Sequence, residues 1–113
     1  MQNEFLASFP AAAGFQLVWL AELKVFNRQP IIGWLLKREH DEDYVVPVTT
    51  HGCADLSKRF DHEAGRGWVI VSPDGCVDDY AEGDFDSVEA FERQIAHEAA
   101  AIAAMRNRST SND

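Results

Sequence analysis

The chain has 113 residues, a net charge of −9 and an isoelectric point near 4.7. This length suits one domain with its own hydrophobic core. An acidic surface of this kind does not bind a phosphate backbone directly, because such affinity comes from Lys and Arg side chains that displace counterions. We therefore expect no direct contact with nucleic acid.

The cysteines and the apolar N-terminal stretch suggest the compartment. Two cysteines cannot build a disulfide framework, so we expect free thiols in a reducing environment. The apolar run over residues 5–21 is broken by Pro10 and Gly14 and lacks a positive leader, so we expect neither a signal peptide nor a membrane span. The expectation is a cytoplasmic protein with a single domain over residues 1–108 and a frayed tail at 109–113.

The first half of the chain predicts strands joined by polar connections. Residues 1–9 are short and mixed, and the stretch that begins at Pro10 ends them. Residues 15–21 alternate as a strand does, although residues 15–26 also fit a helical stripe. The strand is preferred because the preceding Gly14 and the Val-Trp pair favour it.

The next expected elements follow from β-branched runs and turn residues. Pro47 favours an edge position or a bulge in its strand, because proline has no amide hydrogen to donate. Asp55 is placed to cap a short helix that carries Leu56 and Phe60 and ends by Gly65. In order, we expect a turn at 27–30, a strand at 31–37, a charged connection at 38–43, a strand at 44–50 and the short helix.

The clearest signals lie between residues 65 and 108. The run from Trp68 to Val71 is apolar on both faces, which predicts an interior strand. A Ser-Pro-Asp-Gly turn over 72–75 follows, so residues 76–80 should return antiparallel. Asp86 and Glu89 have capping-box spacing, which predicts a helix over 87–107 that is roughly 30 Å long.

The apolar stripe of this helix steps by three or four residues, and Glu92 and Glu98 are expected to point away from it. The pattern predicts an α+β fold, an antiparallel sheet of four or five strands with the long C-terminal helix packed across one face. Trp19, Trp34 and Trp68 should fill one core, since large aromatic side chains dominate core burial. The stripe consists of Val88, Phe91, Ile95, Ala99, Ile102 and Met105.

The acidic residues are unevenly placed, because residues 39–113 hold 17 of the 19 acids. Two runs without Lys or Arg can present a surface that occupies a basic groove of another protein, as a phosphate backbone would. We therefore expect a small acidic protein-binding module, such as an inhibitor of a nucleic-acid-binding partner. Its expected contact residues are Glu39, Asp41, Glu42, Asp43, Asp78, Asp79, Glu82, Asp84 and Asp86.

The alternative is a metal site or a Cys/His-dependent small enzyme that uses His51, Cys53, His62 and Cys76. These are zinc-compatible ligand types, but their spacing matches no common zinc module. A thiolate nucleophile would need a polarised niche, and no oxyanion motif is visible. We therefore expect no catalytic residues, no cofactor and no bound metal.

A second binding prediction is self-association. Small alanine side chains line more than one face of the second half of the long helix, so another helix can approach closely. An alanine-rich surface is equally typical of a helix selected for propensity alone. A homodimer through the C-terminal helix is therefore a further expectation.

Overall fold

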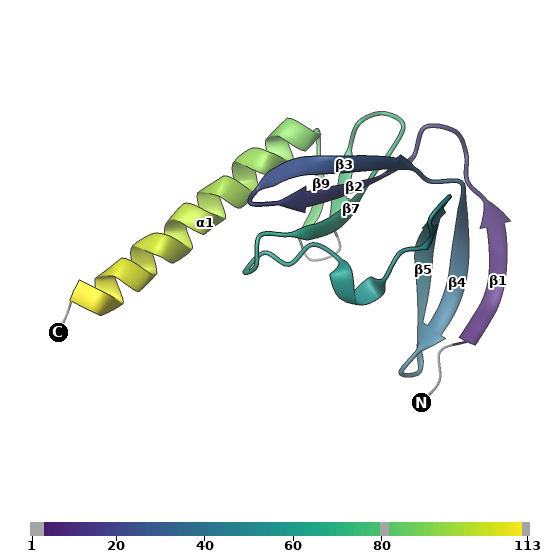
Figure 1. The fold of residues 1–113 in the computed structure, drawn as a ribbon, viewed down its shortest axis with the longest axis horizontal. Helices are drawn as coiled ribbons and strands as arrows, with labels where there is room; N and C mark the ends of the chain where they lie inside the picture. The colour runs from purple at the N-terminus through teal and green to yellow at the C-terminus, as the bar shows by residue number, and fades with distance from the viewer. Residues whose placement is uncertain (1–3, 80–81, 112–113) are drawn as a thin grey trace.

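The computed structural model describes residues 4–79 and 82–111, which form an α+β fold (Figure 1). A four-stranded antiparallel sheet has the order β1-β4-β5-β6, and a five-stranded antiparallel sheet has the order β3-β2-β7-β8-β9. The elements are β1 (Glu4–Pro10), β2 (Gln16–Ala21), β3 (Lys24–Pro30), β4 (Gly33–Glu39), β5 (Glu42–Thr49), β6 (Gly52–Cys53), the 3₁₀ helix η1 (Leu56–Lys58), β7 (Gly67–Val71), β8 (Val77–Asp79), β9 (Gly83–Phe85) and α1 (Val88–Ser111). The predicted fold class is confirmed, with the strands divided over two sheets.

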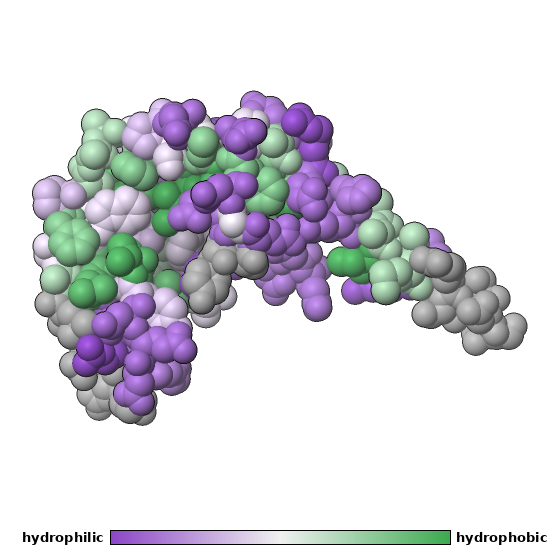
Figure 2. All heavy atoms as spheres, turned by 180° about the vertical axis from the view of Figure 1, so that it is seen from behind, coloured by the Kyte–Doolittle hydropathy of each residue, from purple (hydrophilic) through white to green (hydrophobic). Residues whose placement is uncertain are grey.

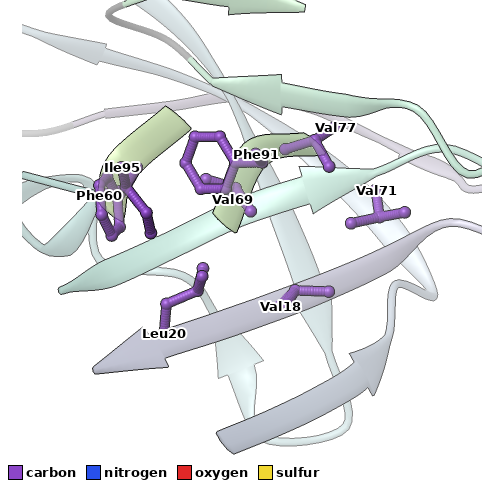
Figure 3. Packing of buried hydrophobic residues seen from close by; sticks show 8 residues of the cluster. All are labelled: Val18, Leu20, Phe60, Val69, Val71, Val77, Phe91 and Ile95. Carbon is purple, nitrogen blue, oxygen red and sulfur yellow. The ribbon is translucent and has the colours of Figure 1, made fainter. Parts of the chain in front are cut away.

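The five-stranded sheet is the middle layer, and its central strands β2 and β7 are buried on both faces. Val18 and Val69 point to one side, where they pack under Phe91 and Ile95 of α1 (Figure 3). Leu17 and Trp68 belong to a second buried cluster that joins this sheet to the four-stranded one. The prediction of an interior strand at 68–71 is confirmed.

The three tryptophans share the second cluster, as predicted. Trp68 is buried, and Trp19 and Trp34 are partly buried against the same group. The Trp68 indole N–H donates to the Asp55 carbonyl at 2.8 Å, which satisfies its one polar atom. This bond ties β7 to the start of η1.

Two hairpin turns contain residue types that rarely adopt the positive φ angles found there. Glu22 and Leu23 have φ of 53° and 69°, and His40 and Asp41 have φ of 51° and 66°. Two successive positive φ values match the right-handed twist of hairpin strands but usually need Asn or Gly. The predicted turn at 27–30 is wrong, because strand β3 covers these residues and the turn lies at Glu22 and Leu23 instead. The predicted connection at 38–43 is also wrong, because only residues 40–41 lie between β4 and β5.

The hairpin at 72–75 is confirmed, since the Gly75 amide donates to the Ser72 carbonyl at 2.9 Å. Residues 77–79 return antiparallel as β8, while Tyr80 of the expected return strand lies outside the described residues. The cap of α1 is Ser87 and not Asp86, because the Ser87 hydroxyl accepts from the Ala90 amide at 3.0 Å. Asp86 lies one residue too early to reach that amide.

The helix α1 packs through its first turns and then projects beyond the sheets (Figure 1). Phe91 and Ile95 are buried, whereas Met105 is 61% exposed. The helix is described as far as Ser111, and residues 112–113 of the expected frayed tail lie outside the described part. No helix among the described residues is long and apolar enough to cross a membrane.

Candidate functional site

The two acid runs approach one hollow between the sheets. Asp43 lines it from β5, and Asp78 and Asp79 line it from β8. The hollow has a volume of about 250 Å³ and aromatic walls that include Tyr44 and Trp68. Acids that are far apart in the sequence therefore border the same surface recess.

The first acid run forms the tip of the β4–β5 hairpin, which is the hydrophilic lobe at the lower left of Figure 2. Arg38 pairs with Asp43 at 2.9 Å, and Lys37 lies 3.7 Å from Glu39. The Tyr44 hydroxyl donates to Glu42 at 2.8 Å. The run is exposed at Asp41, Glu42 and Asp43, and its charge is partly balanced by the neighbouring bases.

The residues of the second acid run lie on both strands of the β8–β9 hairpin, in its turn and just after it. Asp78 and Asp84 are exposed and lie opposite each other in the ladder. Partial desolvation of the carboxyl, with repulsion from Asp84 and Asp79, raises the pKa of Asp78. Asp86 is exposed just before α1, whereas Asp79 is buried and bonds to His62. Asp79 is therefore not available to a partner.

Replacing Asp78 with asparagine should stabilise the free protein by about 0.5 kcal/mol at pH 7, because like charges opposite each other destabilise strand pairs. A raised folded-state pKa means that ionised Asp78 weakens the fold as pH rises above the unfolded value of about 3.9. The gain should shrink at about pH 3, where the carboxyl is mostly neutral in both states. Urea denaturation at both pH values, with Glu63→Gln as the control, measures it. An equal gain at both pH values would contradict this origin.

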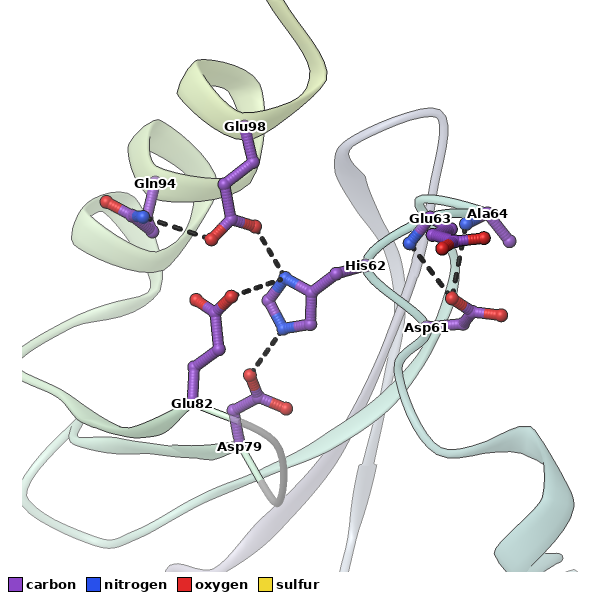
Figure 4. A network of polar contacts seen from close by, with 8 residues as sticks. All are labelled: Asp61, His62, Glu63, Ala64, Asp79, Glu82, Gln94 and Glu98. Atoms are coloured by element: carbon purple, nitrogen blue, oxygen red, sulfur yellow. Dashed lines mark hydrogen bonds and ion pairs between the residues drawn. The ribbon is translucent and has the colours of Figure 1, made fainter. Parts of the chain in front are cut away.

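A network of polar contacts surrounds His62 (Figure 4). The ring nitrogen Nε2 lies 2.6 Å from Asp79 Oδ2, and Nδ1 lies 2.6 Å from Glu98 Oε1. Glu82 Oε2 lies 3.5 Å from the same Nδ1. Gln94 donates to the other Glu98 oxygen at 3.0 Å. Three carboxylates from three segments therefore surround one imidazole.

Local sequence places each member of the network. Asp61 accepts from the Glu63 and Ala64 amides, and this tight turn presents His62 toward α1. Glu98 lies seven residues after Phe91, so it falls on the buried face of the helix and not on the outer face that was expected. The His62 ring is packed edge-on against Phe60 and Phe91.

The electrostatics of the network follow from its geometry. Burial opposes the charged form of His62, but the hydrogen bonds to Asp79 and Glu98 prevail and raise its pKa. A hydrogen bond to Glu98 raises the pKa of Glu82. Burial opposes ionisation of Glu98, but bonds from Glu82, Gln94 and His62 lower its pKa. The network therefore favours the protonated forms of His62 and Glu82 and the ionised form of Glu98.

The four Cys and His residues of the alternative prediction do not form one group within the described residues. His62 clusters with Glu82 and Glu98, while Cys53 and His51 are exposed at β6 and the turn before it. A hydrogen bond to Asp74 raises the pKa of the Cys76 thiol, which opposes the thiolate that a nucleophile needs. Both cysteines are free, as expected.

Comparison with known proteins yields no relative, since no protein-family model, curated protein or solved structure matches the chain.

Sequence reasoning singled out His62, Asp79 and Glu82 separately and missed that they meet. It missed Glu98 because that residue was assigned to the solvent side of the helix. One signal was available, since Glu98 continues the spacing from Phe91 through Ile95 by a further helical step. An acidic residue on the same helix face as buried apolar residues indicates that its carboxylate has a polar partner on the element packed against that face.

Proposed function

We propose that the protein is a non-enzymatic binding module that receives a basic segment of another protein in the hollow between its sheets. The observation that carries the proposal is that Asp43 and Asp78, from two distant acid runs, line the same recess. Acids on both sides of a recess attract one Lys or Arg side chain more strongly than scattered surface charges do. The partner is a protein with a basic, nucleic-acid-binding surface, which the module inhibits by occupying it.

The strain within the acid cluster supports a cationic partner. Asp78 faces Asp84 across the ladder, and partial desolvation with mutual repulsion raises its pKa. A bound cation would relieve this repulsion and favour the ionised carboxylates. Sites that are unfavourable in the free protein are often functional, because binding compensates their cost.

The walls of the hollow suit the stem of a long basic side chain. Tyr44 and Trp68 provide apolar faces on which the methylenes of Lys or Arg can pack. Arg59 lies 5.7 Å from the centre of the Tyr44 ring, so one guanidinium of the chain already packs against this surface. We place the exposed acids Asp41, Glu42 and Asp84 as steering charges around it.

The test starts from capture of the partner on the immobilised full chain in nuclease-treated cell lysate. The double variant Asp43→Asn with Asp78→Asn should bind the captured partner at least tenfold more weakly, because both acids line the hollow. The matched control is Glu63→Gln with Glu89→Gln, which removes the same charge from exposed positions elsewhere. Titration calorimetry at two salt concentrations measures both.

The expected partner is basic, survives nuclease treatment and dissociates as salt rises. Equal weakening by the two double variants would contradict a role for the hollow. A partner that is not basic, or one that binds independently of salt, would contradict the acidic mode of binding. The free thiols of Cys53 and Cys76 support the proposed cytoplasmic setting.

A homodimer through the second half of α1 remains a proposal. This half projects from the body with exposed Ala100, Ala103 and Met105 (Figure 1). A helix without tertiary contacts is only marginally stable in water, so a partner helix would stabilise it.

A further inference from the structure

We infer that His62, Glu82 and Glu98 form a binding site for one divalent transition-metal ion, with zinc as the preferred ion. Their ligand atoms, one from each residue, lie within 4.8 Å of one another. They come from the 61–66 turn, the turn before β9 and α1, so one ion would join three separate segments. None of the three ligands lines the hollow of the proposed function, although Asp79, which bonds to His62, borders both sites.

The hydrogen bond between the His62 ring and Asp79 determines which ring nitrogen can bind a cation. A neutral ring has one N–H and one lone pair, and the buried Asp79 takes the N–H of Nε2 at 2.6 Å. The Nδ1 lone pair then faces the acceptor oxygens of Glu98 at 2.6 Å and Glu82 at 3.5 Å. One nitrogen and two carboxylate oxygens of metal-ligand type therefore converge on one point, where a metal ion can bind all three.

The distances between the ligand atoms suit a zinc ion. Zinc holds nitrogen and carboxylate oxygen ligands at about 2.0–2.2 Å, so neighbouring ligand atoms of a tetrahedral site lie about 3.4 Å apart. The separation of 3.5 Å between Nδ1 and the Glu82 oxygen already matches this edge. The Glu98 oxygen, at 2.6 Å from Nδ1, has to retreat by less than about 1 Å, which rotation of its side chain allows.

The surrounding residues provide the outer support that metal sites require. Asp79 has a side chain only 2% exposed, and it fixes the tautomer that leaves Nδ1 free to bind metal. Gln94 holds the second oxygen of Glu98 at 3.0 Å and so orients the carboxylate. A carboxylate behind the histidine and a hydrogen bond behind a glutamate are the usual outer partners of metal ligands.

The donor set selects the class of ion. Imidazole nitrogen favours transition metals over calcium or magnesium, and two carboxylates disfavour copper(I), which prefers sulfur. Two ionised carboxylates with a neutral imidazole complement a divalent charge. The Glu82 side chain is 33% exposed, so the site is open to solvent and a water molecule can complete the coordination.

Zinc titration of the purified full chain, freed of metal by a chelator, tests the inference against a competing colorimetric zinc indicator. The wild-type protein should bind one ion per chain. His62→Ala should weaken zinc binding at least 100-fold, and Glu82→Gln and Glu98→Gln at least tenfold each. Glu82→Gln is the safest variant, because an exposed carboxylate can be neutralised without harm to the core, and circular dichroism checks its fold.

The matched control is His51→Ala with Cys53→Ser, which removes the exposed pair that can bind zinc adventitiously. This control should bind zinc as the wild type does. Cobalt substitution gives a separate readout, since the expected site produces visible d–d bands without the thiolate charge-transfer band of a cysteine site. The hollow variant Asp43→Asn with Asp78→Asn should also keep the zinc, which separates this site from the proposed function.

The inference fails if the folded wild type takes up no stoichiometric zinc. It also fails if folded Glu82→Gln and His62→Ala bind zinc as tightly as the wild type does. Loss of zinc in the His51→Ala and Cys53→Ser control would assign binding to the exposed pair and overturn the site at His62.

Discussion

Substitution of Gly67 by alanine should lower the free energy of unfolding by about 3 kcal/mol or more, because backbone strain and overpacking each cost about 1–3 kcal/mol. Gly67 has a φ of +135°, which side-chain-bearing residues rarely adopt. A Cβ there would lie 2.5 Å from the Phe60 Cα and 2.7 Å from the Arg59 carbonyl oxygen. These are backbone atoms, so no flexible side chain can move aside. Urea denaturation followed by tryptophan fluorescence measures the loss.

Gly75→Ala is the matched control for this prediction. Gly75 also has a positive φ, of +92°, but a Cβ added there would meet nothing within 4 Å. Only the conformational strain remains, which costs about 1–2 kcal/mol. A loss at Gly67 no larger than that at Gly75 would show that the close approach of residues 59 and 60 to β7 relaxes at little cost.

Phe91→Ala should lower the free energy of unfolding by about 3–5 kcal/mol, the usual cost of emptying a buried aromatic site. Phe91 has no exposed surface, and its ring meets Phe60 and Phe85 edge-on at 5.2 and 5.0 Å between ring centres. It is the main anchor of α1 on the five-stranded sheet. Since small domains have only about 5–15 kcal/mol in total, this change should leave the fold marginal.

Met105→Ala on the same helix is the control for Phe91. Its side chain is 61% exposed on the projecting half of α1, so the expected change is within about 0.5 kcal/mol. Phe91→Leu keeps most of the buried volume and should lose less than Phe91→Ala. Equal effects at Phe91 and Met105 would mean that the helix is not anchored at its first turns.

Local patterns predicted the parts of the fold that depend on local chemistry. The run from Trp68 to Val71, the turn over 72–75 and the long helix carried strong periodic or turn signals, and the structure contains all three. Strand β3 was missed because its turn uses Glu22 and Leu23, which carry no hairpin signal. Strand β1 was missed because it forms through pairing with β4, which is distant in the sequence, and β9 was missed because it has only three residues, two of them Gly83 and Asp84, which carry no strand signal.

The candidate sites depend on contacts that no local pattern records. The run containing Asp78 was found as a charge cluster, but its approach to Asp43 arises from the packing of one sheet on the other. The network at His62 needs the turn at 61–66, the β8–β9 hairpin and α1 to be placed together. Residue types were visible in the sequence, and their convergence was not, because it is set by tertiary packing.

The pairing of β2 with β7 determines the order in which the chain can fold during its synthesis. The β2–β3 and β4–β5 hairpins have local contacts, so each can form soon after its residues leave the ribosome. One face of β2, with Val18 and Leu20, stays uncovered until β7 and then α1 have emerged, since Val69, Phe91 and Ile95 complete its cluster. We expect the nascent chain to expose this apolar face for most of translation, a period in which chaperones would protect it from aggregation.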